Sequence, residues 1–459
     1  MSFRGSRILP AFLAVALSLL VGCGGGTTGN NGGQAATPKA FYTSPSDIPV
    51  SGPSVPGVEA YDQAVKAFML KWNVPGLTIA VARNGQLIVA RGYGYADYDA
   101  KQLMQPDSRM RIASASKAFT AAAVLHLIEQ GKLRLDDRFL DVLSQYQVSG
   151  NGDQRLRQIT IRQLLQHSGG WDREKSGDPM GMSQTIVSAL KVPAPATCSD
   201  TIRYMMGRPL DFNPGERFAY SNFGYCILGR VVEKLTGQRY EDYVRNEVLA
   251  PMGIRAMSIG RTMLNQRGLN EVRYYDYVGA PLYQSEFPNG GQVEGPYGLF
   301  SIETNECYGG WVASAIDLTR FMTALDGTRG SFLNSEMTTD MTAKPDLVVP
   351  DPTPGWNGAY RTDGWYGMGL FLQPDTPAGL TWWHWGNMPG TDSVMLRNGR
   401  GYAWAALVNT FTANGNAASF MNDLDALMWN AFNSGVPGSG TDLYPQFPSA
   451  DVPPSGAQN

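Results

Sequence analysis

The sequence is poor in the residues that build disulfide-crosslinked folds, metal sites and nucleic-acid-binding surfaces. Its 459 residues include four cysteines and three histidines, and 37 basic residues stand against 40 acidic ones. Four cysteines at this length exclude a disulfide scaffold, and a chain without a basic excess is no electrostatic binder of nucleic acid. A His-Glu-x-x-His run, paired cysteines at metal spacing and cofactor signatures are all missing. We therefore expect no metal, no cofactor and no nucleic-acid partner.

The chain has enough apolar residues to form a large buried core without disulfide cross-links. Hydrophobic residues make up 43% of the chain and charged residues 17%. At roughly 100 to 200 residues per domain, this length corresponds to two or three domains, or to one large α/β unit with an inserted domain. The composition is that of a globular protein of enzyme size, and it leaves the oligomeric state open.

The first residues have the layout of an export signal. Arg4 and Arg7 precede an apolar run over residues 8–21, whose length of about 14 residues is below the roughly 20 that span a bilayer as a helix. We therefore expect residues 1–22 to be a signal peptide. The run ends in Leu-Val-Gly-Cys, which resembles a bacterial lipobox, so Cys23 is the expected site of lipidation. The alternative is an ordinary secretory signal in which Cys23 is incidental.

Cys23 and the segment that follows it predict a protein that is held on the cell envelope by a lipid anchor in the membrane. Residues 23–57 begin with a Gly-rich stretch and are expected to form a flexible tether. The sequence does not decide which membrane carries the anchor. Export to an oxidising compartment allows one disulfide among Cys198, Cys226 and Cys307, and the spacing leaves the pair open.

Both ends of the remaining chain predict helix and antiparallel strand, whereas the middle predicts mostly helix. Helical spacing of apolar residues covers 58–72 and 417–432, and β-rich runs cover 77–82, 87–92, 365–372, 380–385, 391–397 and 402–408. We expect an α/β (α+β) domain over residues 58–432. Its antiparallel sheet is built from both ends and flanked by helices, and a helical domain is inserted at about 100–260. The Pro- and Gly-rich residues 433–459 are expected to be an irregular tail.

Three short motifs carry the candidate chemistry. Ser114 stands at the start of an Ala-rich helical stretch, and Lys117 lies one helical turn further on. The second motif is Tyr220-Ser221-Asn222, ahead of another apolar helix, and the third is His384-Trp385-Gly386 on an expected strand. Each motif is weak alone, since a second Ser-x-x-Lys occurs at residues 188–191. The other two histidines, at 126 and 167, are interpreted as packed or structural residues.

The three motifs in this order resemble the serine β-lactamase and penicillin-binding protein superfamily. The likeness is to class C β-lactamases, D-alanyl-D-alanine carboxypeptidases, D-aminopeptidases and family VIII carboxylesterases. Two further blocks, at residues 159–170 and 309–321, extend it, so that it covers about residues 58–432. The resemblance implies a β-lactamase/transpeptidase-like fold and a serine hydrolase that acts on a small-molecule ester, peptide or amide.

The resemblance also implies roles for the motif residues. Ser114 would be the nucleophile, and either Lys117 or Tyr220 the general base, an assignment that the sequence leaves open. The N–H groups of Ser114 and Asn387 would hold the oxyanion, and Asn222 would hold Lys117 and the substrate amide. His384 would form the third wall of the site, with Trp385 beside it and Gly386 letting the substrate lie against the backbone.

The third motif departs from the family pattern in a way that bears on the substrate. His384 replaces a Lys, and Trp385 stands where a Thr hydroxyl is common, so the site offers less positive charge to a substrate carboxylate. This disfavours an efficient β-lactamase and favours ester or neutral amide substrates. We expect a carboxylesterase for small or medium acyl esters, and the alternative is a D-alanyl-D-alanine carboxypeptidase, D-aminopeptidase or amidase. An inactive ligand-binding envelope protein is the alternative outside enzymes.

An aromatic stretch between the second and third motifs has two interpretations. Tyr274, Tyr275, Tyr277, Tyr283 and Tyr297 fall in a segment rich in Gly and Pro. They could form an aromatic rim for acyl chains. Alternatively, they pack a long loop onto its own domain.

Overall fold

The computed structural model describes residues 40–150, 152–349, 363–375, 379–412, 417–435 and 441–451. The expected signal peptide, Cys23 and the first part of the expected tether lie outside these ranges, as do residues 452–459 of the expected tail. Among the helices described, none has the length and apolar character needed to cross a membrane.

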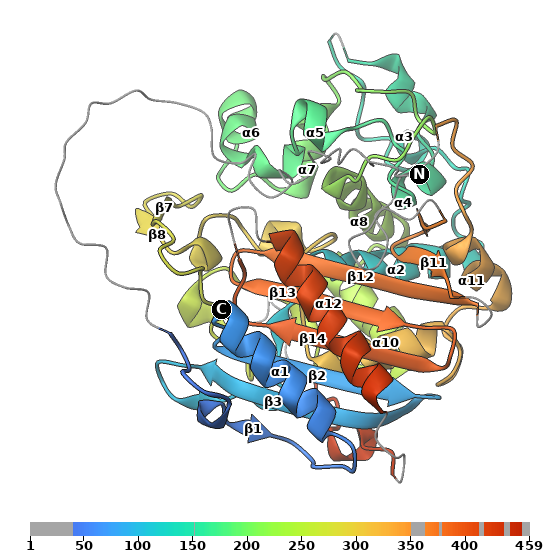
Figure 1. Cartoon of the computed structure of the whole chain (residues 1–459). Helices are drawn as coiled ribbons and strands as arrows, with labels where there is room; N and C mark the ends of the chain where they lie inside the picture. The colour runs from blue at the N-terminus through green and yellow to red at the C-terminus, as the bar shows by residue number, and fades with distance from the viewer. Residues whose placement is uncertain are drawn as a thin grey trace, which may run out of the picture.

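One antiparallel sheet, built from both ends of the chain, forms the centre of the fold (Figure 1). Within the described residues it has nine strands, in the order β1-β3-β2-β14-β13-β12-β11-β10, with β4 paired to β3. The two ends meet where β2 pairs with β14, from Leu77 opposite Val408 to Arg83 opposite Tyr402. The strands are β1 (Val50–Ser51), β2 (Gly76–Arg83), β3 (Gln86–Asp97), β4 (Gln102–Leu103), β10 (Trp365–Tyr366), β11 (Phe371–Pro374), β12 (Leu380–Met388), β13 (Thr391–Arg397) and β14 (Tyr402–Val408).

Helices cover both faces of this sheet. The helices α1 (Glu59–Trp72) and α12 (Ala417–Ser434) cross one face together, and α10 (Ala315–Leu325) lies behind the other (Figure 1). Along β14 the side chains alternate accordingly: Trp404 and Ala406 pack in the core under α1 and α12, whereas Ala405 and Leu407 belong to the core on the opposite side. A strand buried on both faces needs apolar residues at every position, which explains the continuous apolar run at 402–408.

The middle of the chain forms the expected mostly helical domain, at the top of Figure 1. Its central helix, α2 (Lys117–Glu129), is buried on nearly all sides, as a helix that is apolar all round must be. The disulfide joins Cys198 on α7 to Cys226 on α8, and Cys307 is a buried free thiol. The other helices here are α3 (Phe139–Val142), α4 (Ile161–Leu165), α5 (Arg173–Ser176), α6 (Ser183–Leu190), α7 (Cys198–Met205), α8 (Asn222–Thr236) and α9 (Tyr240–Tyr243).

Small elements complete the fold. A second sheet of three short strands links β5 (Met110–Arg111), β9 (Trp311–Ala313) and β6 (Ser258–Ile259), and a two-stranded one joins β7 (Tyr283–Gln284) to β8 (Gln292–Val293). The helix α11 (Ser335–Thr342) follows α10. The mixed fold with an antiparallel sheet, flanking helices and a helical insertion confirms the fold class expected from the sequence.

The single strand expected at 365–372 is wrong. The segment is instead two strands, β10 and β11, that pair with each other, with Tyr366 opposite Phe371. Gly369, in the left-handed region at φ 84°, lies in the turn between them. A side chain there would overlap Ala121 on α2, so the chain turns where it approaches that helix. The hydrophobic pattern of an apolar run is the same whether the run forms one strand or two strands joined by such a turn.

Two segments expected to lie outside the domain belong to it in part. In the expected tether, Tyr42 and Ile48 are buried, and β1 adds a strand beside β3. In the expected tail, Leu443 and Tyr444 are buried, and the Leu443 N–H donates to the Leu87 carbonyl. Each segment has only a few apolar residues that pack into the core, among many polar, Gly and Pro residues. Its average composition therefore does not indicate that it packs onto the domain.

We predict that replacing Tyr444 with Ala destabilises the protein by about 3 kcal/mol, a usual cost for removing a buried aromatic ring. Tyr444 is 2% exposed, its hydroxyl donates to Thr319, and the guanidinium of Arg329 lies 4.3 Å from its ring centroid. Urea unfolding measures the effect. The exposed neighbour Gln446→Ala should change stability by less than about 0.5 kcal/mol. Equal behaviour of the two variants would mean that the tail does not pack onto the domain.

Candidate active site

The backbone just before Ser114 is held in an unusual conformation. Ala113 adopts φ 46°, in the left-handed region that costs a residue with a side chain of the order of 1 kcal/mol or more. Hydrogen bonds on both sides keep it there: the Ser393 hydroxyl on β13 donates to the Ile112 carbonyl at 2.8 Å, and the Ile112 N–H donates to the Trp311 carbonyl at 2.9 Å. Ser114 then falls in a short 3-10 helix, Ala113–Ser116, that runs directly into α2. Ser114 therefore lies on a fixed turn.

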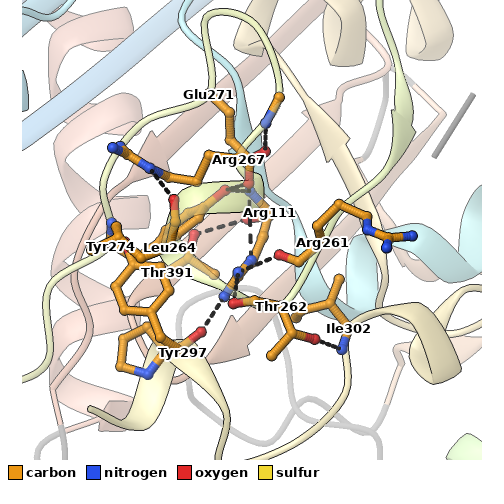
Figure 2. A network of polar contacts seen from close by, with 12 residues as sticks. Arg111, Arg261, Thr262, Leu264, Arg267, Glu271, Tyr274, Tyr297, Ile302 and Thr391 are labelled. Carbon is orange, nitrogen blue, oxygen red and sulfur yellow. Dashed lines mark hydrogen bonds and ion pairs between the residues drawn. The ribbon is translucent and has the colours of Figure 1, made fainter. Parts of the chain in front are cut away.

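A buried arginine anchors the strand that leads into this turn (Figure 2). The Arg111 guanidinium donates to the carbonyls of Pro296, Arg261 and Thr262, and it lies 4.3 Å from the Tyr274 ring centroid. The Thr391 hydroxyl donates to the Arg111 carbonyl at 2.8 Å. The network ties β5 to the loop at 261–297 and to the start of β13.

Much of the aromatic stretch packs onto its own domain. The Tyr274 hydroxyl accepts the Arg111 N–H and donates to Glu271, and the Tyr297 hydroxyl accepts the Tyr274 N–H. The Tyr275 hydroxyl accepts the Tyr98 N–H. The idea of a substrate rim is therefore wrong for Tyr274 and Tyr297, whose rings are buried, whereas for the half-buried Tyr275 it stays a prediction.

Ser114 and Lys117 are in direct contact. The Lys117 Nζ lies 3.2 Å from the Ser114 Oγ and donates to the Tyr308 carbonyl at 2.8 Å. Lys117 is fully buried, whereas Ser114 keeps part of its surface exposed. Burial lowers the pKa of Lys117 well below its ordinary value, and the positive charge of Arg173 lowers it further, against a smaller opposing effect of Asp178. A neutral amine here can donate to Tyr308 and still accept the proton of Ser114.

Tyr220 packs against the same lysine. The Lys117 Nζ and the Arg173 guanidinium each lie 4.8 Å from its ring centroid. The Tyr220 hydroxyl oxygen is buried and makes no direct hydrogen bond within the described residues. Burial raises the pKa of Tyr220 above its ordinary value, and the nearby Ser114 hydroxyl and the charge of Arg173 offset part of that rise.

Asn222 lies at the start of α8 but does not hold Lys117 as expected. Its Nδ2 donates to the Asp178 carboxylate at 2.6 Å, and its buried Oδ1 has no partner among the described residues. The position of the Lys117 Nζ is set by the Tyr308 carbonyl instead. A backbone carbonyl is available at every residue, so the sequence carried no signal for this partner.

His384 is fully buried and uncharged. Its Nδ1 is 2.5 Å from the Trp385 carbonyl and its Nε2 is 3.3 Å from the Tyr366 hydroxyl, an arrangement that fits a proton on Nδ1. Burial lowers its pKa to about 3, and a positive charge on Lys117 would act in the same direction. Both ring nitrogens have internal partners, so the expected wall of the site is a neutral ring. On the opposite face of the strand, Trp385 stacks on Phe371 at 5.0 Å.

Gly386 has a packing role that the sequence does not predict. A side chain at this position would overlap the Ile112 carbonyl oxygen and would crowd the Ser393 hydroxyl. The glycine therefore lets β12 lie against the backbone that precedes Ser114, and its expected contact with a substrate stays a prediction. The next residue, Asn387, donates from its side chain to the buried carboxylate of Asp392 at 2.6 Å.

One edge of β12 is open beside this contact. The neighbouring strand β11 pairs only with Leu380–Trp383, whereas β13 pairs with β12 as far as Met388. Residues 384–388 therefore have a strand partner on one side only within the described chain. This is the part of β12 that packs against the Ala113–Ser116 turn.

The sequence missed two charged groups of the site, Arg173 and Asp178. Both fall in a short charged segment, residues 172–178, with no periodic pattern to mark it. The described residues contain no group of three or more His, Cys, Asp or Glu side chains that could hold a metal ion. Two surface hollows, of about 480 and 370 Å³, are lined by residues 134–142 with 234–235 and by residues 213–216 with 348–349, and neither includes Ser114.

Comparison with known proteins identifies the family. The Beta-lactamase family model matches residues 61–427, so the chain belongs to this family of serine hydrolases. Protein flp of Staphylococcus aureus (strain COL) is 30% identical over 219 residues, which are 48% of this chain and 41% of the relative. The probable fimbrial assembly protein FimD, serogroup H1, of Dichelobacter nodosus is 29% identical over 247 residues, 54% of this chain and 56% of the relative. The matches thus span about half the length of these curated relatives.

Solved structures show the same fold at low sequence identity. The D-amino acid amidase from Ochrobactrum anthropi SV3 superimposes with a TM-score of 0.62 at 22% identity, over 82% of this chain and 99% of the amidase. EstCE1, a hydrolase with promiscuous acyltransferase activity, gives 0.61 at 21% identity over 80% and 99%. The octameric penicillin-binding protein homologue from Pyrococcus abyssi gives 0.60 at 22% identity over 81% and 77%.

We predict that Gly386→Ala lowers the rate of Ser114 acylation by about 100-fold, since a displacement near 1 Å at a catalytic group has an effect of this size. The added methyl group would push β12 away from Ile112. The rate is measured by active-site labelling with a fluorophosphonate. Gly207→Ala is the matched control, because a side chain there meets its neighbours only at ordinary distances, and its rate should be unchanged. An unaffected Gly386→Ala would contradict the packing role of this glycine.

Proposed function

We propose that this protein is a cell-envelope carboxylesterase that acts on small or medium acyl esters through an acyl-Ser114 intermediate. The observation that carries the proposal is the 3.2 Å contact between the Ser114 hydroxyl and the amine of the fully buried Lys117. A serine hydroxyl is a weak nucleophile unless a base takes its proton. Burial lowers the pKa of Lys117 and so favours the neutral amine, which can act as that base.

The chemistry proceeds in two steps. The Ser114 oxygen attacks the ester carbonyl carbon, its proton passes to Lys117, and the alcohol leaves with that proton. Water then hydrolyses the acyl-Ser114 ester and releases the acid. Burial lowers the pKa of Lys117 and raises that of Tyr220, so of the two candidate bases we assign proton transfer to Lys117. Tyr220 packs against the amine and shields it from water.

The oxyanion that forms on the ester carbonyl needs hydrogen-bond donors beside Ser114. We assign the N–H groups of Ser114 and Asn387 to the oxyanion, as the family resemblance implies. Ser114 lies at the mouth of α2, where the helix dipole adds positive potential, and Asn387 lies on the open stretch of β12.

The ester preference rests on the charge of the third motif. A permanent cation at this position would suit a substrate carboxylate, whereas His384 is neutral and has both nitrogens occupied. An ester with an uncharged acyl group needs no such cation. The likeness to EstCE1 is one of fold, and it is compatible with this assignment.

A D-amino-acid peptidase or amidase is the second candidate, and one observation favours it. Arg173 lies over the Tyr220 ring, and its side chain is 29% exposed. Its ion-pair partner, Glu174, is 54% exposed, so the pair is screened by solvent and easily exchanged for a substrate carboxylate. This cation could replace the one that the third motif lacks.

The cell-envelope part of the proposal is supported by the N-terminal sequence alone. The charged start, the apolar run and the lipobox-like end at Cys23 favour export followed by lipid attachment. Palmitate labelling of the expressed protein, with Cys23→Ser as the control, tests this part separately.

The activity is tested by time-resolved intact-mass spectrometry of the protein starting at Gly24. We expect a short-chain nitrophenyl ester to add its acyl mass rapidly and transiently, and a penicillin to add mass slowly without turnover. Ser114→Ala should show neither adduct. A D-Ala-D-Ala peptide that turns over faster than the ester, and loses that advantage in Arg173→Gln, would establish the second candidate instead. A folded protein that no reagent acylates would leave only a ligand-binding role.

A further inference from the structure

His167, interpreted from the sequence as structural, contacts the peptide groups on both sides of Tyr220. It follows α4 in the left-handed region at φ 55° and is 1% exposed. The Ala219 N–H donates to the His167 carbonyl at 2.8 Å, and the Ser221 N–H donates to the His167 Nδ1 at 3.1 Å. One residue thus holds the backbone immediately before and immediately after Tyr220.

The ring of the same histidine holds the side chain of Tyr220. The ring centroids of His167 and Tyr220 are 4.3 Å apart at an interplanar angle of 39°, and Tyr366 packs against the same histidine at 4.5 Å. Tyr220 is therefore fixed by two backbone hydrogen bonds and by a ring contact that all come from His167. A histidine that only filled space in the core would not need to make all three of these contacts with one neighbour.

The hydrogen bonds also define the state of the histidine. Because Nδ1 accepts from Ser221, the proton lies on Nε2, which is buried and has no partner among the described residues. An unpaired buried N–H costs about 1 to 3 kcal/mol, so the ring keeps this position at the expense of stability. Protonation of Nδ1 would break the bond to Ser221.

The groups around the ring oppose that protonation. Burial lowers the pKa of His167 well below its ordinary value, and a positive charge on Lys117, His384 or Arg173 would lower it further. The other polar side chains against the ring are the tyrosines Tyr220, Tyr225 and Tyr366.

We propose that His167 is the positioning residue of Tyr220: its carbonyl and Nδ1 accept the N–H groups of Ala219 and Ser221 and thereby hold the Tyr220 ring against Lys117 beside Ser114. The inference rests on the proposed hydrolytic function. It assigns His167 no contact with substrate, since its effect on the reaction passes through Tyr220.

The test uses two amides that place their acceptor differently. In His167→Asn the side-chain oxygen can occupy the place of Nδ1, and Asn tolerates positive φ. In His167→Gln the oxygen reaches the place of Nε2 instead. We expect the Gln variant to lose about 100-fold in the rate of Ser114 acylation, since a displacement near 1 Å beside the reacting groups has an effect of this size, and the Asn variant to lose less than about tenfold. His126→Asn, on the half-buried surface of α2, is the control and should leave the rate unchanged.

A double-mutant cycle separates positioning from general damage. The cycle uses Tyr220→Ala, which removes the ring that His167 positions. Tyr220→Phe would not serve, because it keeps that ring. We expect His167→Gln to lower the rate by less than about threefold there, because the effects of two residues that act through one group are not additive. A further 100-fold loss in that background, or equal losses in the Asn and Gln variants, would overturn the proposal.

The state of the ring is tested without activity. With three histidines in the chain, 15N-labelled histidine gives three ring signals that single substitutions assign. We expect His167 to stay neutral, with its proton on Nε2, from pH 5 to 9. A proton on Nδ1 would overturn the proposal even in an active enzyme. A wild-type protein that fails to acylate while His167 keeps the expected state would instead count against the hydrolytic function.

Discussion

The complete burial of Lys117 beside Ser114 is the constraint on which the rest of the site depends. A buried ammonium group is costly unless it is paired, and no carboxylate is bonded to this one among the described residues. The amine is therefore biased towards its neutral form, which is the form that can accept a proton. The neighbouring positive charge of Arg173 strengthens the bias, and the Tyr308 carbonyl fixes the direction of the amine.

The position of Ser114, the proposed nucleophile, depends on close contacts between segments far apart in the sequence. The left-handed Ala113 is held because Ile112 is bonded to β13 on one side and to Trp311 on the other. The absence of a side chain at Gly386 lets β12 approach the same residue. These contacts come from strands of a sheet buried on both faces, and a catalytic group supported by rigid elements keeps its geometry better than one on a loop.

The sequence could predict what local spacing determines. The strands at 391–397 and 402–408 were predicted at their observed bounds, because a β-rich run and the Gly turn between them are local signals. The contact between Ser114 and Lys117 follows from their separation of one turn. The turn at Gly369, the space at Gly386 and the contacts of His167 could not be predicted, because each depends on what another segment brings within a few ångströms. Which of Lys117 and Tyr220 accepts the Ser114 proton stays a prediction.

The measurement that tests this account most directly is the rate of Ser114 labelling by a fluorophosphonate as a function of pH. If a buried neutral lysine accepts the proton, the rate rises as Lys117 loses its proton and reaches a plateau at a pH well below 10.4, the ordinary lysine value. Lys117→Met should abolish this rise. A rate that increases only near the ordinary lysine pKa, or that keeps the same profile in the Met variant, would contradict the central claim.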